Sequence, residues 1–312
     1  MEHFQIAFQV VAPLVIYMAV GGLVRALGIL KRETLLEMNS FIFKVMIPIS
    51  LFFDIYGADL GSAVDGKLFF WTAALVTATF AVALLVCRKT IPQGPDIPTV
   101  AQGIARSNYV LFGTVISYSL AGEAGTAVTA ALAVLVVPLF NILAVVVFEI
   151  QRGGRISWKK LLWQIVKNPL VDAGILGAAV NLSGLKLPGL LYEPLNTLGD
   201  IASPLALVVL GGMLSFKSMV SHKGRLLAAV FCRLVAVPVV CLGIMAALGF
   251  RDETLVALLA VFASPTAVAS APMAQSLGGN GVLAGEIVAL TTAGSILTVF
   301  LFIAAFKAMG MF

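Results

Sequence analysis

The chain has 312 residues, of which 60% are hydrophobic and only 11% charged, whereas a soluble domain usually carries about 25% charged residues. This composition disfavours a water-soluble enzyme, and the net charge of +5 sits in short segments between apolar runs, where it gives no reason to expect nucleic acid as a partner. Cys87, Cys232 and Cys241 fall in or beside apolar runs, so they predict neither a disulfide framework nor a metal site.

Apolar runs long enough to cross a bilayer, about 20 residues each, follow one another along the chain. The first run has no basic segment before it and is too long for the apolar region of a signal peptide, so we expect it to be the first span. The predicted spanning helices are residues 6–30, 35–57, 67–87, 97–121, 124–149, 161–183, 190–215, 224–249, 253–277 and 282–309. The predicted fold class is an all-α membrane protein of about ten transmembrane helices.

Lysine and arginine gather in alternate loops between these helices. The basic residues of these four loops are Lys31, Arg32, Arg88, Lys89, Arg152, Arg155, Lys159, Lys160, Lys217, Lys223 and Arg225. The loops on the other side carry mainly Asp and Glu. Cytoplasmic loops are the basic ones, so both termini are predicted outside the cytoplasm, in a multi-pass protein of the cell's inner or plasma membrane.

The two halves of the chain resemble each other. With a shift of 156 residues, Pro13-Leu14-Val15 falls on Pro169-Leu170-Val171, Gly21 on Gly177 and Pro48 on Pro204; with a shift of 157, Ser107 falls on Ser264. An odd number of spans per repeat turns the second half upside down, which is the inverted-repeat plan of many secondary transporters. The predicted units are residues 1–150 and 161–312, joined by a cytoplasmic linker at 151–160.

Two predicted helices carry polar or helix-breaking residues near their centres. Helix 97–121 contains Arg106-Ser107-Asn108-Tyr109 followed by Gly113, and helix 253–277 contains Ser264-Pro265-Thr266 followed by Pro272. Proline interrupts a helix, and a serine followed by proline is typical of a helix start. We therefore expect both helices to be broken, with Gly113, Pro265 and Pro272 permitting the breaks.

Two half-helix N-termini that face each other offer unpaired N–H groups and partial positive charge, which suit an anion. Arg106 adds a full cation beside one of them. The predicted binding residues at the two breaks are Arg106, Ser107, Asn108, Tyr109, Ser264, Pro265 and Thr266. The alternative is that the prolines and glycines mark ordinary kinks, which are common in membrane helices.

Further ionisable residues fall within or near the apolar runs, where they are costly unless they face a partner or a cavity. They are Lys44, Asp54, Asp172, Asp200, Arg233 and Glu286. Lys44, Asp172, Asp200 and Glu286 are candidates for a proton or cation path, and Lys44 and Asp200, which are repeat-equivalent, are candidates for an ion pair. Alternatively, Lys44 and Arg233 reach the headgroups, and Asp172 and Asp200 lie near water.

The sequence holds no Gly-x-Ser-x-Gly elbow, no phosphate-binding loop and no His-Glu-x-x-His motif, which disfavours an enzyme and an ATP-driven pump. No cofactor is expected beyond a coupling H⁺ or Na⁺. A membrane sensor that keeps a transporter fold is the alternative function, although sensors usually carry a soluble signalling domain and no such domain is recognisable here.

This pattern resembles the auxin efflux carrier family, including its bacterial malate or malonate permeases, and more distantly the bile acid:sodium symporters. Met46-Ile47-Pro48, Asn108 and Ser264-Pro265 carry the resemblance. It implies a scaffold of helices 1, 2, 6 and 7, a moving part of helices 3–5 and 8–10, an elevator mechanism and a homodimer. It also implies a small organic anion, a mono- or dicarboxylate, bound near Asn108, Pro265 and Ser50. Helix 97–121 departs from the family because it lacks the proline at its break.

Overall fold

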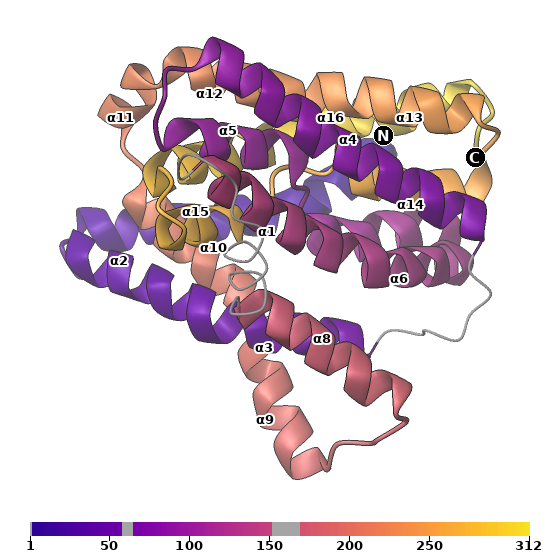
Figure 1. The fold of residues 1–312 in the computed structure, drawn as a ribbon, viewed down its shortest axis with the longest axis horizontal. Helices are drawn as coiled ribbons and strands as arrows, with labels where there is room; N and C mark the ends of the chain where they lie inside the picture. The colour runs from indigo at the N-terminus through magenta and orange to yellow at the C-terminus, as the bar shows by residue number, and fades with distance from the viewer. Residues whose placement is uncertain (1, 58–64, 152–168) are drawn as a thin grey trace.

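The computed structural model describes residues 2–57, 65–151 and 169–312, and in this part of the chain every named element is a helix (Figure 1). Of the linker predicted at 151–160, only Gln151 is described, and it is the last residue of a helix; the rest of the linker, with its four basic residues, and residues 161–168 of the predicted helix 161–183 lie outside the described part. The helices are α1 Glu2–Ala26, α2 Arg32–Phe41, η1 Ile42–Met46, α3 Ile47–Tyr56, α4 Gly66–Thr90, α5 Asp96–Ala105, α6 Tyr109–Gln151, α8 Pro169–Leu182, α9 Gly189–Asp200, α10 Ala202–Met213, α11 Phe216–Ser221, α12 Lys223–Phe231, η2 Cys232–Ala236, α13 Val237–Ala247, α14 Asp252–Ala263, α15 Ser270–Ser276 and α16 Gly281–Ala308.

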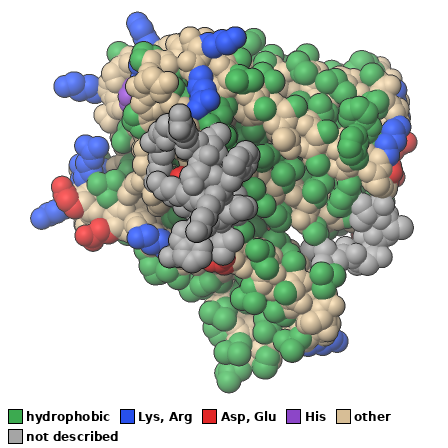
Figure 2. All heavy atoms as spheres, viewed as in Figure 1, with side chains coloured by type: hydrophobic (Ala, Val, Ile, Leu, Met, Phe, Trp, Pro, Cys, Tyr) green, Lys and Arg blue, Asp and Glu red, His purple; other side chains and the backbone are tan. Residues whose placement is uncertain are grey.

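Six helical segments in this part of the chain are long and apolar enough to cross a membrane. They are Arg32–Tyr56, Gly66–Thr90, Val115–Gln151, Gly189–Met213, Lys223–Ala247 and Gly281–Ala308, and Val11–Ala26 and Pro169–Leu182 are shorter apolar helices. Hydrophobic side chains cover much of the face of the molecule that Figure 2 shows. The prediction of an all-α membrane protein is confirmed.

The long helix α6 is two helices joined by a sharp reversal at Gly122, whose φ of 61° and ψ of −146° are not helical. The reversal falls between the predicted helices 97–121 and 124–149. Across it, the hydroxyls of Ser117 and Thr129 lie 2.5 Å apart, and the Tyr109 hydroxyl donates to the Thr129 carbonyl oxygen at 2.7 Å. These bonds fasten residues 109–121 against residues 123–151.

Prolines explain the irregular turns in three other helices. The π-turns η1 and η2 directly precede α3 and α13, in which Pro48 and Pro238 are the second residues. A proline has no N–H for the carbonyl four residues earlier and its ring crowds that carbonyl, so the helix widens there. The helix predicted over 190–215 is interrupted at Ile201. Pro204 explains this interruption, because it has no N–H to donate to the carbonyl of Asp200 four residues earlier.

Two glycines allow helices to pack with their backbones in contact. Gly21 of α1 lies against α10, where a Cβ at this position would be 1.8 Å from the carbonyl oxygen of Val208. Gly177 of α8 lies against α3 in the same manner, where a Cβ would be 2.7 Å from the carbonyl oxygen of Phe52. No larger residue fits at either position without moving the backbone of the neighbouring helix.

Among the described residues, many Lys and Arg side chains gather at the end of the molecule that holds α2 and α11 (Figures 1 and 2). A surface hollow there is lined by Arg25, Arg32, Lys217 and His222. The side chain of Arg225, just inside α12, pairs with that of Asp96 at the start of α5. Arg88 donates to the Gln151 side chain at 3.1 Å, which joins the ends of α4 and α6.

Candidate functional site

The two helices that the sequence predicts to be broken are both interrupted, and they meet at their interruptions. Helix α5 ends at Ala105, and α6 begins at Tyr109; α14 ends at Ala263, and α15 begins only at Ser270. Ser107 and Thr266 form an isolated antiparallel β-bridge. We call residues 106–108 and 264–269, which meet there, the crossover.

Two backbone hydrogen bonds hold the crossover together. The N–H of Asn108 donates to the carbonyl oxygen of Pro265 at 2.8 Å, and the N–H of Ala267 donates to that of Arg106 at 3.2 Å. Thr266 adds two more bonds, because its N–H donates to the Thr291 hydroxyl and its own hydroxyl donates to the Gly103 carbonyl. Backbone groups that leave their helices here are therefore paired again, as an apolar environment requires.

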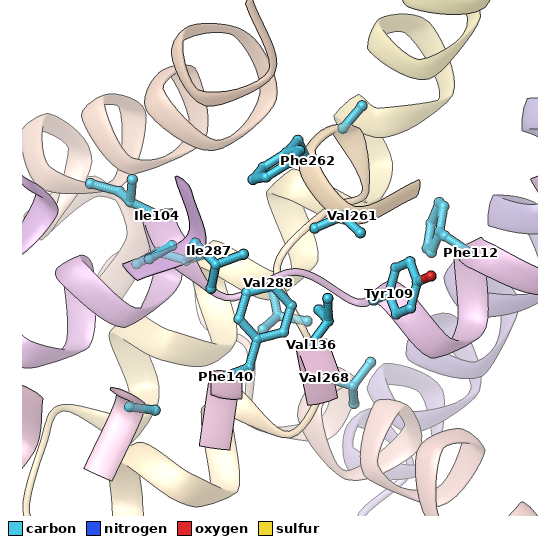
Figure 3. Close-up of a cluster of buried hydrophobic side chains, with 14 of the residues drawn as sticks. Ile104, Tyr109, Phe112, Val136, Phe140, Val261, Phe262, Val268, Ile287 and Val288 are labelled. Carbon is cyan, nitrogen blue, oxygen red and sulfur yellow. The ribbon is translucent and has the colours of Figure 1, made fainter. Parts of the chain in front are cut away.

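Apolar side chains from four helices enclose the crossover (Figure 3). The labelled residues around it are Ile104, Tyr109, Phe112, Val136, Phe140, Val261, Phe262, Val268, Ile287 and Val288, and all are buried. This packing excludes water from most of the crossover and strengthens the electrostatic effect of the charges within it.

A cavity of about 210 Å³ lies beside the crossover. Its polar or charged lining residues are Ser50, Asp54, Arg106, Ser107, Asn108, Tyr109, Asn141, Asp200 and Ser203. The apolar lining residues come from α3, from both legs of α6, from α10 and from Ala267–Ala269, just before α15. The N-terminal ends of both α6 and α15 therefore border the cavity, as the sequence predicts.

Arg106 lines this cavity with a positively charged side chain, and the residue is only 6% exposed. Its Nη2 donates to Oδ1 of Asn141 at 2.7 Å, and its Nη1 lies 2.8 Å from the Met273 sulfur. Within the described residues it has no carboxylate partner. A buried guanidinium that meets only neutral groups is left with positive charge that an anion can balance.

Two polar side chains beside Arg106 are also incompletely satisfied. The hydroxyl of Ser107 and the Nδ2 amide of Asn108 are buried and have no hydrogen-bond partner within the part of the chain that the structure describes. Buried polar groups are nearly always paired, so unpaired donors on a cavity wall indicate a place for a ligand oxygen.

Two carboxylates also line the cavity. Asp54 of α3 and Asp200 at the end of α9 both line the cavity, and Asp200 accepts a bond from the Asn196 side chain at 3.1 Å. The sequence predicted Asp200 as a path residue but did not place Asp54 in the site. It also missed Asn141, although a polar residue within an apolar helix is a signal that points to a cavity or a partner.

Some of the predicted binding residues line the cavity, and the others are packed in the protein interior. Ser50, Arg106, Ser107, Asn108 and Tyr109 line the cavity, although the Tyr109 hydroxyl is engaged by Thr129. Ser264, Pro265 and Thr266 are buried in the crossover and do not line the cavity.

The breaks themselves differ in detail from the prediction. Gly113 lies inside α6, where it allows close contact with Thr129, and Pro272 lies in the first turn of α15, where a proline is tolerated. Neither residue is at a break. Ser264 ends α14 rather than starting the next helix, so Pro265 is not a first helical residue.

The other predicted path residues lie away from the cavity. Lys44 and Asp172 are exposed, and the described residues contain no ion pair between Lys44 and Asp200. Glu286 is fully buried, and its Oε2 lies 2.9 Å from Nδ1 of His222. Its other oxygen has no partner in the described structure.

An all-α membrane domain whose interrupted helices meet beside an internal cavity defines the class of this protein as a membrane transporter. Residues 6–303 match the family model described as "Membrane transport protein", so the chain belongs to this family, that of the auxin efflux carriers. The family resemblance drawn from the sequence is confirmed. A search of the curated proteins returned no match to this chain.

Proposed function

We propose that this membrane transporter is a secondary transporter of small organic anions, such as malate, malonate or auxin-like acids. The observation that carries the proposal is Arg106, a buried cation on the wall of the cavity with only neutral partners among the described residues. A carboxylate in the cavity would receive a charge-assisted bond from the guanidinium, which is about twice as strong as a neutral hydrogen bond.

The rest of the cavity suits the same ligand. The unpaired donors of Ser107 and Asn108 and the N-terminal ends of α6 and α15 favour negative charge. The cavity of about 210 Å³ lies below the roughly 300–1,000 Å³ typical of drug-sized ligands, which favours acids of few carbons.

Coupling to protons or sodium ions is part of the proposal. Asp54 and Asp200 add two carboxylates to the cavity that Arg106 also lines. An anion that binds in the cavity adds further negative charge beside these two carboxylates. A proton or a cation that enters with the anion offsets the repulsion between the anion and the carboxylates. These two residues are therefore better candidates for the coupling groups than Asp172 and Lys44, which do not line the cavity.

Two helix contacts support the inverted repeat of about ten helices, because the repeat relates each contact to the other. The shift of 156 residues carries Gly21 onto Gly177 and Phe52 onto Val208. Gly21 contacts Val208, and Gly177 contacts Phe52. A twofold-related pair of halves produces such reciprocal contacts, with the substrate site near the interface between the halves.

An elevator mechanism fits this arrangement. In the proposal, the helix pairs α1–α10 and α3–α8 belong to a scaffold that also forms a homodimer, and the part that carries the crossover moves against it. The cavity has walls from both parts, because Ser50 and Asp54 belong to α3 and Arg106 to the crossover. The end with the basic loops would face the cytoplasm, with both termini outside.

Uptake into proteoliposomes tests this function. Labelled malate, malonate and indole acetate are supplied in turn, with a proton gradient, a sodium gradient or no gradient. The proposal predicts accumulation or exchange of at least one anion by the wild type and its loss in Arg106→Gln, whose neutral side chain keeps similar size. If no anion moves under any gradient, the transporter function proposed here is wrong and the sensor alternative gains support.

A further inference from the structure

Arg233 lies in the π-turn η2, on helix α12–η2–α13, and is 1% exposed. Its guanidinium contacts five backbone carbonyl oxygens of the two half-helices that end at the crossover. Nε donates to Ser264 at 2.8 Å, Nη1 to Ile104 at 3.2 Å and Ala105 at 3.3 Å, and Nη2 to Val261 at 3.3 Å and Phe262 at 2.8 Å. A guanidinium has five N–H groups, so its donors are matched by these oxygens.

The crossover explains why these carbonyls need an outside donor. In a continuous helix the carbonyl of Val261 would accept from residue 265, which is a proline without an N–H. The carbonyl of Phe262 would accept from Thr266, whose N–H goes to Thr291. The carbonyl of Ile104 would accept from Asn108, whose N–H goes to Pro265. Each break therefore leaves carbonyl oxygens orphaned at the end of a half-helix.

The helix ends that surround the Arg233 guanidinium are also of one sign of charge. The C-terminal ends of α5 and α14 both carry partial negative charge, and they converge in a buried region. No carboxylate contacts Arg233 within the described residues, so its positive charge is balanced by these helix ends alone. The sequence left open whether Arg233 reaches the headgroups or faces a partner, and its burial shows that it faces a partner.

We propose that Arg233 is the resident cation of the crossover, a positioning residue that fills a cation site formed by five carbonyl oxygens. Without the side chain, this site would take a cation from solution, because converging carbonyl oxygens are ligands that hard cations accept. Arg233 does not line the substrate cavity. It acts on the anion through the backbone, because it holds α5 and α14 in place and offsets their negative ends, which would otherwise weaken the positive end of α6.

Chemical rescue tests this proposal. The purified Arg233→Ala protein is compared with the wild type and with Leu234→Ala, which opens a buried apolar gap at the next position of the same turn. We expect Arg233→Ala to lower Tm, and low millimolar guanidinium to raise it again while leaving the wild type and Leu234→Ala unchanged. This readout does not depend on the proposed function. For anion binding, which rests on that function, we expect a loss of about tenfold in affinity that guanidinium recovers.

If guanidinium restores neither Tm nor binding of Arg233→Ala, the assignment of a cation site is wrong. If Arg233→Ala does not fold, Arg233→Lys and Arg233→Gln replace it, since both are flexible donors and only lysine is charged. Greater stability of the lysine variant than of the glutamine variant supports the proposal. Equal or greater stability of the glutamine variant contradicts it, because hydrogen bonding without charge would then be enough.

Discussion

The backbone N–H of Asn108 donates to the carbonyl oxygen of Pro265, and the 2.8 Å bond joins the two interrupted helices. It replaces the intrahelical bond that Asn108 would otherwise make to Ile104. Asn108 thus connects three parts of the structure: its N–H fixes the crossover, its carbonyl accepts the N–H of Phe112 in the first turn of α6, and the residue lines the cavity. Substitutions that change only the side chain separate binding from the fold.

Asn108→Ala tests that separation. The variant keeps the backbone bonds and loses the unpaired Nδ2 donor, so we expect weaker anion binding, by about tenfold, with little change in Tm. Asn108→Asp, which is nearly isosteric, places a negative charge in the same position and should abolish binding. Calorimetric titration of the purified variants with malate and malonate provides the comparison. Wild-type affinity in both variants would remove Asn108 from the site.

Asp54→Asn tests the coupling group. In the wild type, we expect anion uptake to strengthen as the pH falls, because a proton that binds with the anion offsets the repulsion from the cavity carboxylates. The neutral asparagine removes the need for that proton, so uptake by Asp54→Asn should depend less on pH. Asp172→Asn, at an exposed position on α8, is the matched control and should follow the wild type.

Initial uptake rates measured over a pH series decide this question, with Asp200→Asn as a parallel variant. A pH profile that is the same in the wild type, Asp54→Asn and Asp200→Asn would show that neither carboxylate takes up the coupling proton. A wild type that responds to a sodium gradient and not to pH would assign the coupling to sodium.

Gly21→Val tests the backbone contact between α1 and α10. A side chain at this position collides with the carbonyl of Val208, and overpacking of this kind usually costs about 1–3 kcal/mol. The adjacent Gly22→Val is the matched control, because its Cβ would lie 3.8 Å from the nearest neighbouring atom, the Gly211 carbonyl oxygen. Thermal unfolding in detergent should show a lower Tm for Gly21→Val than for Gly22→Val. Equal Tm values would mean that the two helices do not pack as closely as described.

The breaks in the helices were predictable because backbone chemistry marks them. Pro265 cannot donate a hydrogen bond, and the weak sequence repeat transfers its break to Ser107 and Asn108, which have no proline beside them. The extent of each break was not predictable. Residues 264–269 stay non-helical because their backbone groups pair with Arg106 and Asn108 of the crossover and with Thr291 of α16, and such pairing depends on neighbours distant in sequence.

The site was predictable in the same uneven way. Arg106, Ser107 and Asn108 were found because a cation and two polar residues lie together near the centre of an otherwise apolar predicted helix, 97–121. Asp54 and Asn141 were not, since single polar residues in apolar helices do not reveal which cavity they face. The role of Arg233 also lies beyond the sequence, because its five acceptors are backbone carbonyls from two other helices, which leave no mark in the choice of residues.

Titration of the purified protein with malate and malonate measures the central claim most directly, since it asks whether Arg106 binds an anion in this cavity. Wild type, Arg106→Lys and Arg106→Gln are compared. We expect the wild type to bind at least one of these anions, the lysine variant to bind it more weakly because the two-pronged geometry is lost, and the glutamine variant to show no binding. Wild-type affinity in Arg106→Gln would contradict the account.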